Sequence, residues 1–221
     1  MTAETASEVQ ARVLGVILAG GLSRRMEGTE KSLMELAGKP LITHVRDRLA
    51  PQVARLIVNA NGDAARFDFL GLPAVADTIP HHAGPLAGIL AGMRWAEAQT
   101  PDLRFIATAA TDTPFFPADF VARLASASGF AQDRIALATS GGYRHPVFGL
   151  WPVALANDLE TFLNSGQGGK VMRFVERHRL TEVDFDLLLA DGGPMDPFFN
   201  VNTPEEFERA RRLAPEAVHA G

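Results

Sequence analysis

The chain has 221 residues, of which 47% are hydrophobic and 21% are charged, as in a globular protein that buries a substantial core. Its formal net charge of −5 excludes a generally basic surface of the kind that binds nucleic acid or an anionic membrane. It has no cysteine, so disulfides, thiolate metal sites and cysteine nucleophiles are excluded as well.

The first twelve residues lack an apolar core and predict a flexible arm over 1–12, not a signal peptide. From there, short apolar runs alternate with helix-period segments, the pattern of a mostly parallel sheet covered by helices. The predicted strands are Val13–Leu18, Arg55–Asn59, Ala74–Ala76, Arg104–Ala109, Ile135–Thr139, Pro146–Leu150 and Thr181–Phe185. The predicted helices begin near Pro40, Gly84, Pro117, Pro152, Lys170 and Pro204. We expect one α/β domain over 13–213, followed by a flexible tail over 214–221.

The first predicted strand runs directly into paired glycines and a cationic loop. Gly20 and Gly21 let backbone N–H groups approach a bulky anion. The positive charge that a polyphosphate needs comes from Arg24, Arg25 and Lys31. The loop is not a P-loop, because Glu30 precedes Lys31 where a P-loop has glycine, and it lacks the third glycine of a dinucleotide fingerprint. It predicts a nucleoside triphosphate site, against the alternative of a sharp turn.

Polar residues follow the next strands at the edge where ligands of parallel sheets collect. Asn59 is interpreted either as a strand-end cap or as an amide that contacts a base edge or a ribose. Asp77 has the same two interpretations, since a carboxylate accepts hydrogen bonds from guanine N–H groups or ribose hydroxyls. Asn61 is typical of a turn and needs no other explanation. Gly84 opens a helix, either simply as its start or as an N-terminus that favours an anion.

Asp112 lies just past a predicted buried strand and ahead of a proline. It is interpreted either as an Asx turn or as a Mg²⁺ ligand, because hard cations take oxygen donors and keep one or two protein carboxylates plus substrate phosphates. Next to the cationic loop, the Mg²⁺ interpretation is the stronger one. His81 and His82 have no partner at metal-ligand spacing and are interpreted as a solvated pair.

Two later segments are candidates for binding a second substrate. Arg144 and His145 are predicted to hold a phosphate, with the alternative that the following proline merely fixes the conformation of His145. Asn200 and Asn202 alternate on one face of a predicted strand and are expected to reach the metal or the acceptor phosphate. A helix cap before Pro204 is the alternative for Asn202, and the two roles are compatible.

The string Leu18-Ala19-Gly20-Gly21-x-Ser23-x-Arg25-Met26, followed by Lys31 and Leu36-Ala37-Gly38-Lys39-Pro40-Leu41, resembles the opening of the Mg-dependent nucleotidyltransferases. Its Ala-Gly-Gly is similar to the guanylyl-transferring, MobA-type branch that acts on the molybdenum cofactor. The resemblance covers about Val13 to Leu213 and implies a single-domain, three-layer Rossmann-like nucleotidyltransferase fold. Glu27 and Glu30 depart from the family, which usually has Gly and Asp there, and predict an altered loop rather than a lost site.

The resemblance implies Mg-dependent transfer of GMP from GTP to the phosphate of molybdenum-molybdopterin, with release of pyrophosphate. The catalytic residues implied are Arg25, Lys31 and Asp112, and Asp112 is also the implied metal ligand. The nucleotide-binding residues implied are Leu18, Ala19, Gly20, Gly21, Lys31, Asn59, Asp77, Gly84 and Asp112. Weaker acceptor contacts are assigned to Arg144, His145, Asn200 and Asn202.

The implied partners are GTP and molybdopterin-type substrates, together with transient contacts to molybdenum-cofactor biosynthesis proteins and recipient molybdoenzymes. We expect a cytoplasmic monomer. One alternative is a cytidylyl- or sugar-phosphate nucleotidyltransferase, and Gly20 argues against the first of these. The other is a non-catalytic carrier of nucleotide and pterin, against which Lys31 and Asp112 argue.

Overall fold

Strand β1 (Val13–Leu18) belongs to a seven-stranded sheet in the computed structural model, which describes residues 6–19, 30–79, 84–166, 169–190 and 193–217. The order of the strands is β5-β4-β1-β6-β8-β7-β9. The other members are β4 (Arg55–Asn59), β5 (Ala74–Val75), β6 (Phe105–Ala110), β7 (Arg134–Ser140), β8 (Tyr143–Pro152) and β9 (Arg179–Phe185). All residues of β1 are buried, as expected for a strand covered on both faces.

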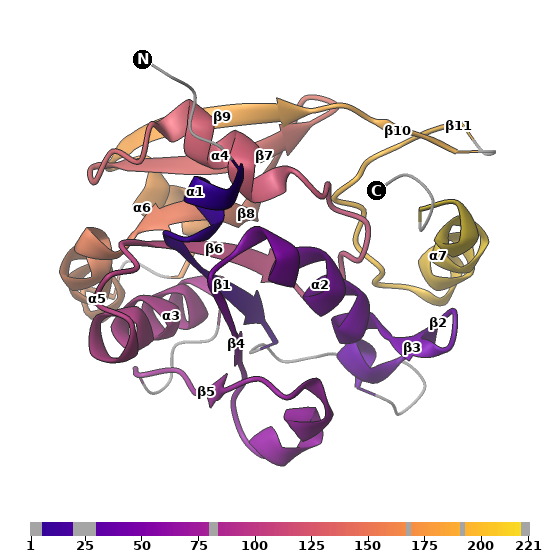
Figure 1. The fold of residues 1–221 in the computed structure, drawn as a ribbon, viewed down its shortest axis with the longest axis horizontal. Helices are drawn as coiled ribbons and strands as arrows, with labels where there is room; N and C mark the ends of the chain where they lie inside the picture. The colour runs from indigo at the N-terminus through magenta and orange to yellow at the C-terminus, as the bar shows by residue number, and fades with distance from the viewer. Residues whose placement is uncertain (1–5, 20–29, 80–83, 167–168, 191–192, 218–221) are drawn as a thin grey trace.

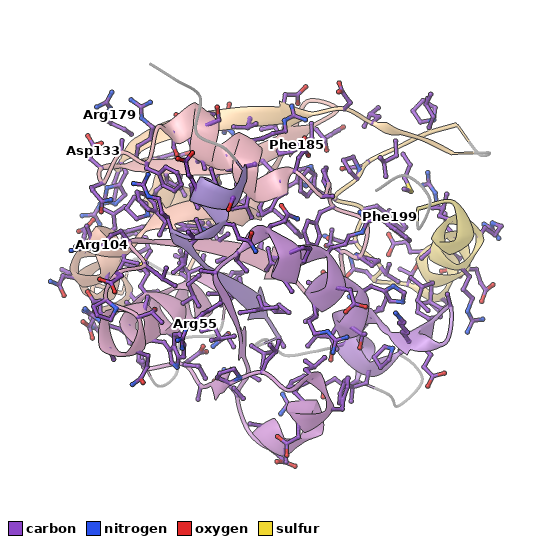
Figure 2. The ribbon with its side chains drawn as sticks, viewed as in Figure 1. Arg55, Arg104, Asp133, Arg179, Phe185 and Phe199 are labelled. Carbon is purple, nitrogen blue, oxygen red and sulfur yellow. The ribbon has the colours of Figure 1, made fainter. Side chains whose placement is uncertain are left out.

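Strand β8 is the one member of this sheet that runs against its neighbours. It pairs antiparallel with both β6 and β7, whereas β5, β4, β1 and β6 are mutually parallel and β7 is parallel to β9. The beginning of β8 therefore lies at the edge where β1 and β6 end. Figure 2 labels both edges: Arg55, Arg104, Asp133 and Arg179 lie near the strand starts, and Phe185 ends β9 on the opposite side.

The register of β8 is interrupted close to this edge. On β7, Leu137 and Ala138 are consecutive, but their partners on β8 are Gly149 and His145, so that Pro146, Val147 and Phe148 are skipped. Strand β6 pairs with β8 only over Gly149–Pro152. A bulge of this kind bends the strand and redirects its side chains. The beginning of β8 therefore separates from the end of β6 and leaves room between them.

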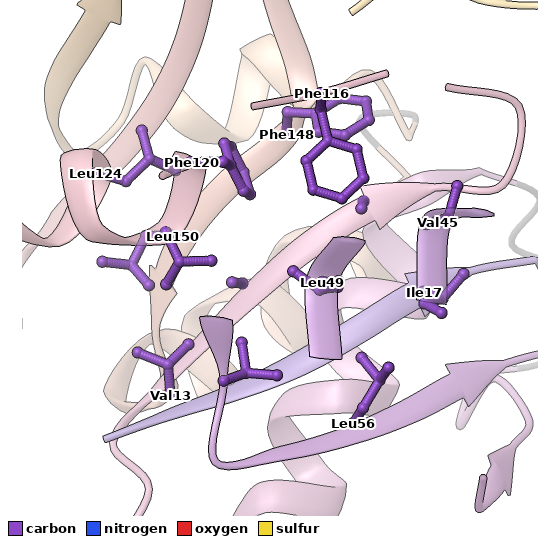
Figure 3. Close-up of a cluster of buried hydrophobic side chains, with 14 of the residues drawn as sticks. Val13, Ile17, Val45, Leu49, Leu56, Phe116, Phe120, Leu124, Phe148 and Leu150 are labelled. Atoms are coloured by element: carbon purple, nitrogen blue, oxygen red, sulfur yellow. The ribbon is translucent and has the colours of Figure 1, made fainter. Parts of the chain in front are cut away.

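Helices cover both faces of the sheet (Figure 1). On one face lie α1 (Ala6–Gln10), α2 (Leu41–Leu49) and α4 (Phe120–Ser128), whose apolar side chains share a core cluster with alternate residues of β1, including Val13 and Ile17 (Figure 3). On the other lie α3 (Pro85–Gln99), α5 (Ala156–Asn164) and α6 (Val171–Val175), packed against Leu14 and Val16. The alternation of β1 between the two clusters follows from the two-residue period of a strand.

A smaller apolar cluster lies beside the sheet. Helix α7 (Pro204–Ala217) packs there beside the hairpin of β2 (Glu35–Leu36) and β3 (Lys39–Pro40). A second hairpin, β10 (Leu188–Ala190) with β11 (Gly193–Met195), extends beyond β9 (Figure 1). Short 3₁₀ helices occupy Lys31–Leu33, Ala50–Gln52, Ala64–Leu70 and Val153–Leu155. In the described part of the chain, no helix is both long enough and apolar enough to cross a bilayer.

The predicted α/β class and mostly parallel sheet are confirmed, and the seven strands predicted between Val13 and Phe185 are all present. The β2–β3 and β10–β11 hairpins were not predicted, because pairs of two- and three-residue strands have too little periodic pattern to detect. Helix α1 lies inside the arm predicted over 1–12 and buries Val9, and α7 extends past residue 213. The strand expected around Asn200 and Asn202 is wrong: both lie in an irregular segment between β11 and α7.

Candidate active site at the carboxyl edge of the sheet

A cavity of about 330 Å³ opens where β1 and β6 end and β8 begins. It is lined by Leu18, Pro85, Ala110, Asp112, Asn200 and the stretch from Arg144 to Phe148. One carboxylate therefore faces two basic side chains across a space within the range of small-ligand sites. The interrupted register of β8 is what creates the space, since β6 and β8 are not paired there.

Asp112 is fixed at the end of β6 through its backbone and its side chain. Its carbonyl oxygen accepts a hydrogen bond from Val201 N–H at 2.8 Å. Its Oδ2 lies 3.1 Å from Lys31 Nζ, and Lys31 also donates to Asn202 Oδ1. The Asp112 and Lys31 side chains are 26% and 14% exposed, so this ion pair is partly shielded from water. The ammonium of Lys31 thus lies between two oxygen acceptors, Asp112 Oδ2 and Asn202 Oδ1.

Thr113 extends this group of oxygens. Its hydroxyl donates to Asn200 Oδ1 at 2.5 Å, and the same Oγ1 is 3.3 Å from Asp112 Oδ1. Asn200 and Asn202 were predicted to reach this place along one strand face. They reach it instead from an irregular segment that the Val201–Asp112 backbone bond attaches to β6. The structure therefore brings together Lys31, Asp112, Asn200 and Asn202 from three distant parts of the sequence.

Asn59 and Asp77, predicted at the ends of neighbouring strands, are in direct contact. Asn59 Nδ2 donates to Asp77 Oδ1 at 2.8 Å and to Val75 O at 3.1 Å. Asn61 binds the other carboxylate oxygen, with Nδ2 2.7 Å from Asp77 Oδ2, and its Oδ1 accepts the Asp77 backbone N–H at 2.9 Å. The interpretation of Asn61 as a plain turn residue is therefore incomplete: its side chain holds Asp77 in place.

Gly88 sets the position of Asn59 from the opposite side. Asn59 is completely buried, and among the described residues its Oδ1 has no hydrogen-bond partner. That oxygen packs against Gly88 so closely that a Cβ at position 88 would come within 2.3 Å of it. The two oxygens that accept hydrogen bonds from Asn59, Asp77 Oδ1 and Val75 O, both lie beside Nδ2. Their position fixes the orientation of the amide. Only glycine leaves enough space for the Asn59 amide at this position of helix α3.

Leu18, Ala19 and Gly84, the other described residues predicted to bind the nucleotide, line the same edge or adjoin it. Leu18 ends β1 and lines the cavity, and the Ala19 N–H donates to Asn59 O at 2.9 Å. Gly84 precedes α3 with φ 146° and ψ 168°, a conformation essentially restricted to glycine. Glu30, which precedes Lys31, is bound to Arg66 at 2.9 Å, and its charge is thereby balanced.

His145 and Arg144 form the basic side of the cavity, and each has an acidic partner that was not predicted. Arg144 Nε is paired with Glu182 of β9. His145 Nε2 lies 2.7 Å from the Ser140 hydroxyl and 3.4 Å from Asp196 Oδ2. Burial lowers the pKa of His145 below its usual value, and the nearby Asp196 carboxylate opposes that shift.

Several predicted residues lie outside the described part of the chain: Gly20, Gly21, Arg24, Arg25, Glu27, His81 and His82. Of the residues that sequence reasoning missed, Asn61 and Thr113 each adjoin a predicted residue, so their proximity was a usable signal. Glu182 and Asp196 come from β9 and from the segment after β11. No local pattern connects them to the cavity.

The fold and this edge define the class, an α/β protein with a cavity and polar side chains at the carboxyl ends of its parallel strands, where folds of this class bind their ligands. The family model of the MobA-like NTP transferase domain matches residues 15–183. The chain belongs to this family. A relative from Bradyrhizobium sp. (strain ORS 278), named molybdenum cofactor guanylyltransferase, is 47% identical over 208 residues, which cover 94% of this chain and 96% of the relative. A relative of the same name from Mesorhizobium japonicum is 46% identical over 201 residues, covering 91% and 95%.

Solved structures agree on the fold. The molybdopterin-guanine dinucleotide biosynthesis protein A from Archaeoglobus fulgidus superposes with a TM-score of 0.68 at 22% sequence identity, covering 92% of this chain and 99% of that chain. The predicted family and its nucleotidyltransferase fold are confirmed.

Proposed function

We propose that this chain is a molybdenum cofactor guanylyltransferase, which transfers GMP from GTP to the phosphate of molybdenum-molybdopterin and releases pyrophosphate. Family membership supports the reaction class, and the name shared by its relatives supports the substrates. The observation in the structure that carries the proposal is the Lys31–Asp112 pair at the end of β6, facing two basic residues across the cavity.

The nucleotide would bind over the ends of β1, β4 and β5. Asp77, held by two amides, offers its remaining lone pairs to guanine N–H groups or ribose hydroxyls. Backbone groups of Leu18, Ala19, Gly20, Gly21 and Gly84 would contact the nucleotide, with the triphosphate over the loop after β1.

The oxygen donors around Lys31 fit a magnesium ion. Asp112 supplies a carboxylate, and amide and hydroxyl oxygens surround it, a hard donor set of the kind that Mg²⁺ takes together with substrate phosphates. A cation already lies between Asp112 and Asn202, namely the Lys31 ammonium. Asp112 would hold the ion, which when bound supplies positive charge to the triphosphate.

Catalysis is chiefly alignment and charge compensation. An oxygen of the acceptor phosphate attacks the α-phosphorus of GTP, and the bond from that phosphorus to the oxygen bridging to the β-phosphorus breaks. The phosphate is already ionised at neutral pH, so no strong base is needed. Two unit charges about 4 Å apart repel by about 4 kcal/mol at an effective dielectric of about 20. Lys31 and Arg25 would offset this repulsion and the charge of the leaving pyrophosphate.

On the acceptor side, Arg144 and His145 would bind the incoming phosphate, and Asn200 and Asn202 would hold its oxygens close to Asp112. The cavity supports this arrangement, because Arg144, His145 and Asn200 line it together with Asp112. The monomeric state, the cytoplasmic location and the transient contacts with cofactor-supplying and cofactor-receiving proteins stay predictions.

Pyrophosphate release measured with each of the four nucleoside triphosphates, with and without molybdopterin-bound molybdenum, tests the proposal. We expect release with GTP only, and only with the acceptor present. Release with CTP or with a sugar phosphate as acceptor would identify a different nucleotidyltransferase. Tight binding of GTP and pterin without release would identify a carrier.

A further inference from the structure

One ring nitrogen of His145 is in contact with two side chains, the buried Ser140 and the partly exposed Asp196. Ser140, completely buried at the end of β7, has its Oγ 2.7 Å from His145 Nε2 and donates its hydroxyl to Asp196 Oδ1 at 2.6 Å. Asp196 Oδ1 also accepts the Phe198 backbone N–H at 2.8 Å, and Oδ2 is 3.4 Å from His145 Nε2. The His145 ring stacks on Phe198, with centroids 4.6 Å apart and an interplanar angle of 27°.

The hydrogens in this group can be counted. A hydroxyl has a single hydrogen, and that of Ser140 is donated to Asp196. The contact between Ser140 and His145 is therefore a hydrogen bond only if Nε2 carries the proton. The reverse direction would require a hydrogen on Asp196 Oδ1, which already accepts the Phe198 N–H. In the neutral ring the proton is thus on Nε2, and the lone pair is on Nδ1.

We propose that Ser140 and Asp196 are positioning residues, which fix the ring proton of neutral His145 on Nε2, so that Nδ1 is the ring atom that takes up a second proton and donates it in a hydrogen bond to an anionic oxygen in the cavity. The identity of that anion, the acceptor phosphate, rests on the proposed function. A carboxylate that holds an imidazole in one tautomer is known from hydrolase triads, but there the hydroxyl is the nucleophile. Ser140 is completely buried here and serves as a spacer between Asp196 and the ring.

The charges around the ring agree with this role. Asp196 faces Nε2, Arg144 is the neighbour on β8 and is paired with Glu182, and Asp112 across the cavity is paired with Lys31. An anion at Nδ1 favours a second proton on the ring, and Asp196 on the far side stabilises the resulting imidazolium. Burial keeps the pKa of His145 low in the ligand-free protein.

His178 provides an internal control. Its Nε2 lies 3.0 Å from Asp158 Oδ2, and its ring contacts Phe174, an arrangement similar to that of His145. It lies just before β9 and does not line the cavity. Asp158→Asn therefore changes a histidine–carboxylate pair of the same kind without touching the proposed acceptor side.

The test is two-bond ¹⁵N–¹H NMR of the full chain labelled at its six histidines, with the His145 signals identified by their loss in His145→Asn. We expect the Nε2–H tautomer in the wild type, a loss of that preference in Ser140→Ala and Asp196→Asn, and no change at His145 in Asp158→Asn. Should Asp196→Asn fail to fold, Ser140→Ala carries the test.

Kinetics supply the second readout. Ser140→Ala and Asp196→Asn should raise the KM for the acceptor about tenfold, the value of one charge-assisted hydrogen bond, and leave the KM for GTP unchanged. In a His145→Ala background the same substitutions should have no further effect. An Nδ1–H spectrum in the wild type, an unchanged tautomer in both variants, or additive losses without His145 would overturn the inference. A wild type that releases no pyrophosphate contradicts the proposed function alone, because the spectra need no substrate.

Discussion

The parallel half of the sheet and the half around β8 bring polar groups to one edge by different means. In the parallel half, the groups lie at strand ends or just past them: Ala19 after β1, Asn59 at the end of β4, and Asp112 after β6. In the other half, β8 enters from the same edge, and its basic residues are held by partners from β7, β9 and the segment after β11.

This difference separates what chain direction dictates from what tertiary packing dictates. Parallel strands that enter a sheet in the same direction must end at one edge, so the residues after them meet whatever the details of packing. No such rule applies to an antiparallel strand with a bulge. The positions of its side chains depend on partners from other elements of the same chain. Substrate binding at the parallel half, the proposed nucleotide side, should therefore tolerate the loss of partners that are distant in sequence. Binding at the half around β8, the proposed acceptor side, should not.

The largest effect is expected at Asp112, in the parallel half. Asp112→Ala removes the carboxylate beside Lys31 and should lower the rate of pyrophosphate release by about a thousandfold or more, as for loss of a main electrostatic group. The thermal unfolding temperature should stay close to that of the wild type, since the side chain is partly exposed. Asp102→Ala, an exposed aspartate ahead of the other end of β6, is the matched control. A fully active Asp112→Ala enzyme would refute the metal assignment.

Lys31→Ala should act next most strongly, and on the nucleotide. Loss of a charge-assisted contact to phosphate predicts a rise in the KM for GTP of about 10- to 100-fold. The KM for the acceptor should change much less. Lys39→Ala removes a lysine that is 59% exposed and paired with Asp47, and should have no effect on either constant. Equal changes in both variants would show that Lys31 acts only through the overall charge.

Gly88→Ala tests whether the position of Asn59 matters to the nucleotide side. The added Cβ would lie 2.3 Å from Asn59 Oδ1 and 2.8 Å from Leu18 Cδ2, so Asn59 must shift, which disturbs its hydrogen bond to Asp77. Overpacking of this kind costs about 1–3 kcal/mol of unfolding free energy, and we expect the KM for GTP to rise severalfold as well.

Gly92→Ala is the control, because on the same helix its Cβ would come within 2.7 Å of Val16 Cγ2, in the core. It should cost a similar free energy of unfolding, measured by urea titration, with the KM for GTP unchanged. If both alanines raise the KM equally, the effect comes from general loosening of α3.

The positions of Asn59, Asp77 and Asp112 at one edge of the sheet could be predicted from the sequence because the signals for the strand ends are local. Runs such as Val13–Leu18 are buried on both faces and are apolar throughout, and the polar residue after each run marks its end. Asp112 follows β6, so chain direction alone places it at this edge, where Lys31, 81 residues earlier in the chain, contacts it. The pairing of Asn61 with Asp77 was missed because Asn-Gly already has a sufficient local explanation in turn chemistry.

The acceptor side could be predicted only in part. The acceptor role of His145 was implied by the family resemblance, but Asp196 follows a hairpin of short strands that has no periodic pattern. The path of Asn200–Asn202 depends on the backbone bond from Val201 to Asp112, a long-range contact that alternation along a strand cannot reveal. The strand around Asn200 and Asn202 was predicted from the alternation of the two residues. Tertiary contacts hold this segment in an irregular conformation instead.

A smaller effect is expected from Asn61→Ala. It removes one of the two amides that hold the Asp77 carboxylate, so the KM for GTP should rise about two- to fivefold with kcat unchanged, in line with loss of one neutral-to-charged hydrogen bond at an exposed position. Comparison with ITP, which lacks the 2-amino group, shows whether Asp77 contacts the base. If it does, the preference for GTP over ITP falls in Asn61→Ala and disappears in Asp77→Ala; an undiminished preference would place Asp77 on the ribose.

The smallest effect concerns His178, which resembles His145 but lies away from the cavity. Burial lowers the pKa of His178, the Asp158 carboxylate opposes that shift, and Arg177 adds to it. The unfolded chain, with an ordinary pKa of about 6.5, therefore binds more protons than the folded chain as the pH falls from neutrality, and stability falls with it. His178→Gln should make the free energy of unfolding, measured by urea titration between pH 7.5 and pH 5.5, less dependent on pH. Asp158→Asn should make it more dependent, because the carboxylate is the group that holds the pKa up. A shallower pH dependence in Asp158→Asn would mean that the carboxylate, and not burial, dominates at this histidine.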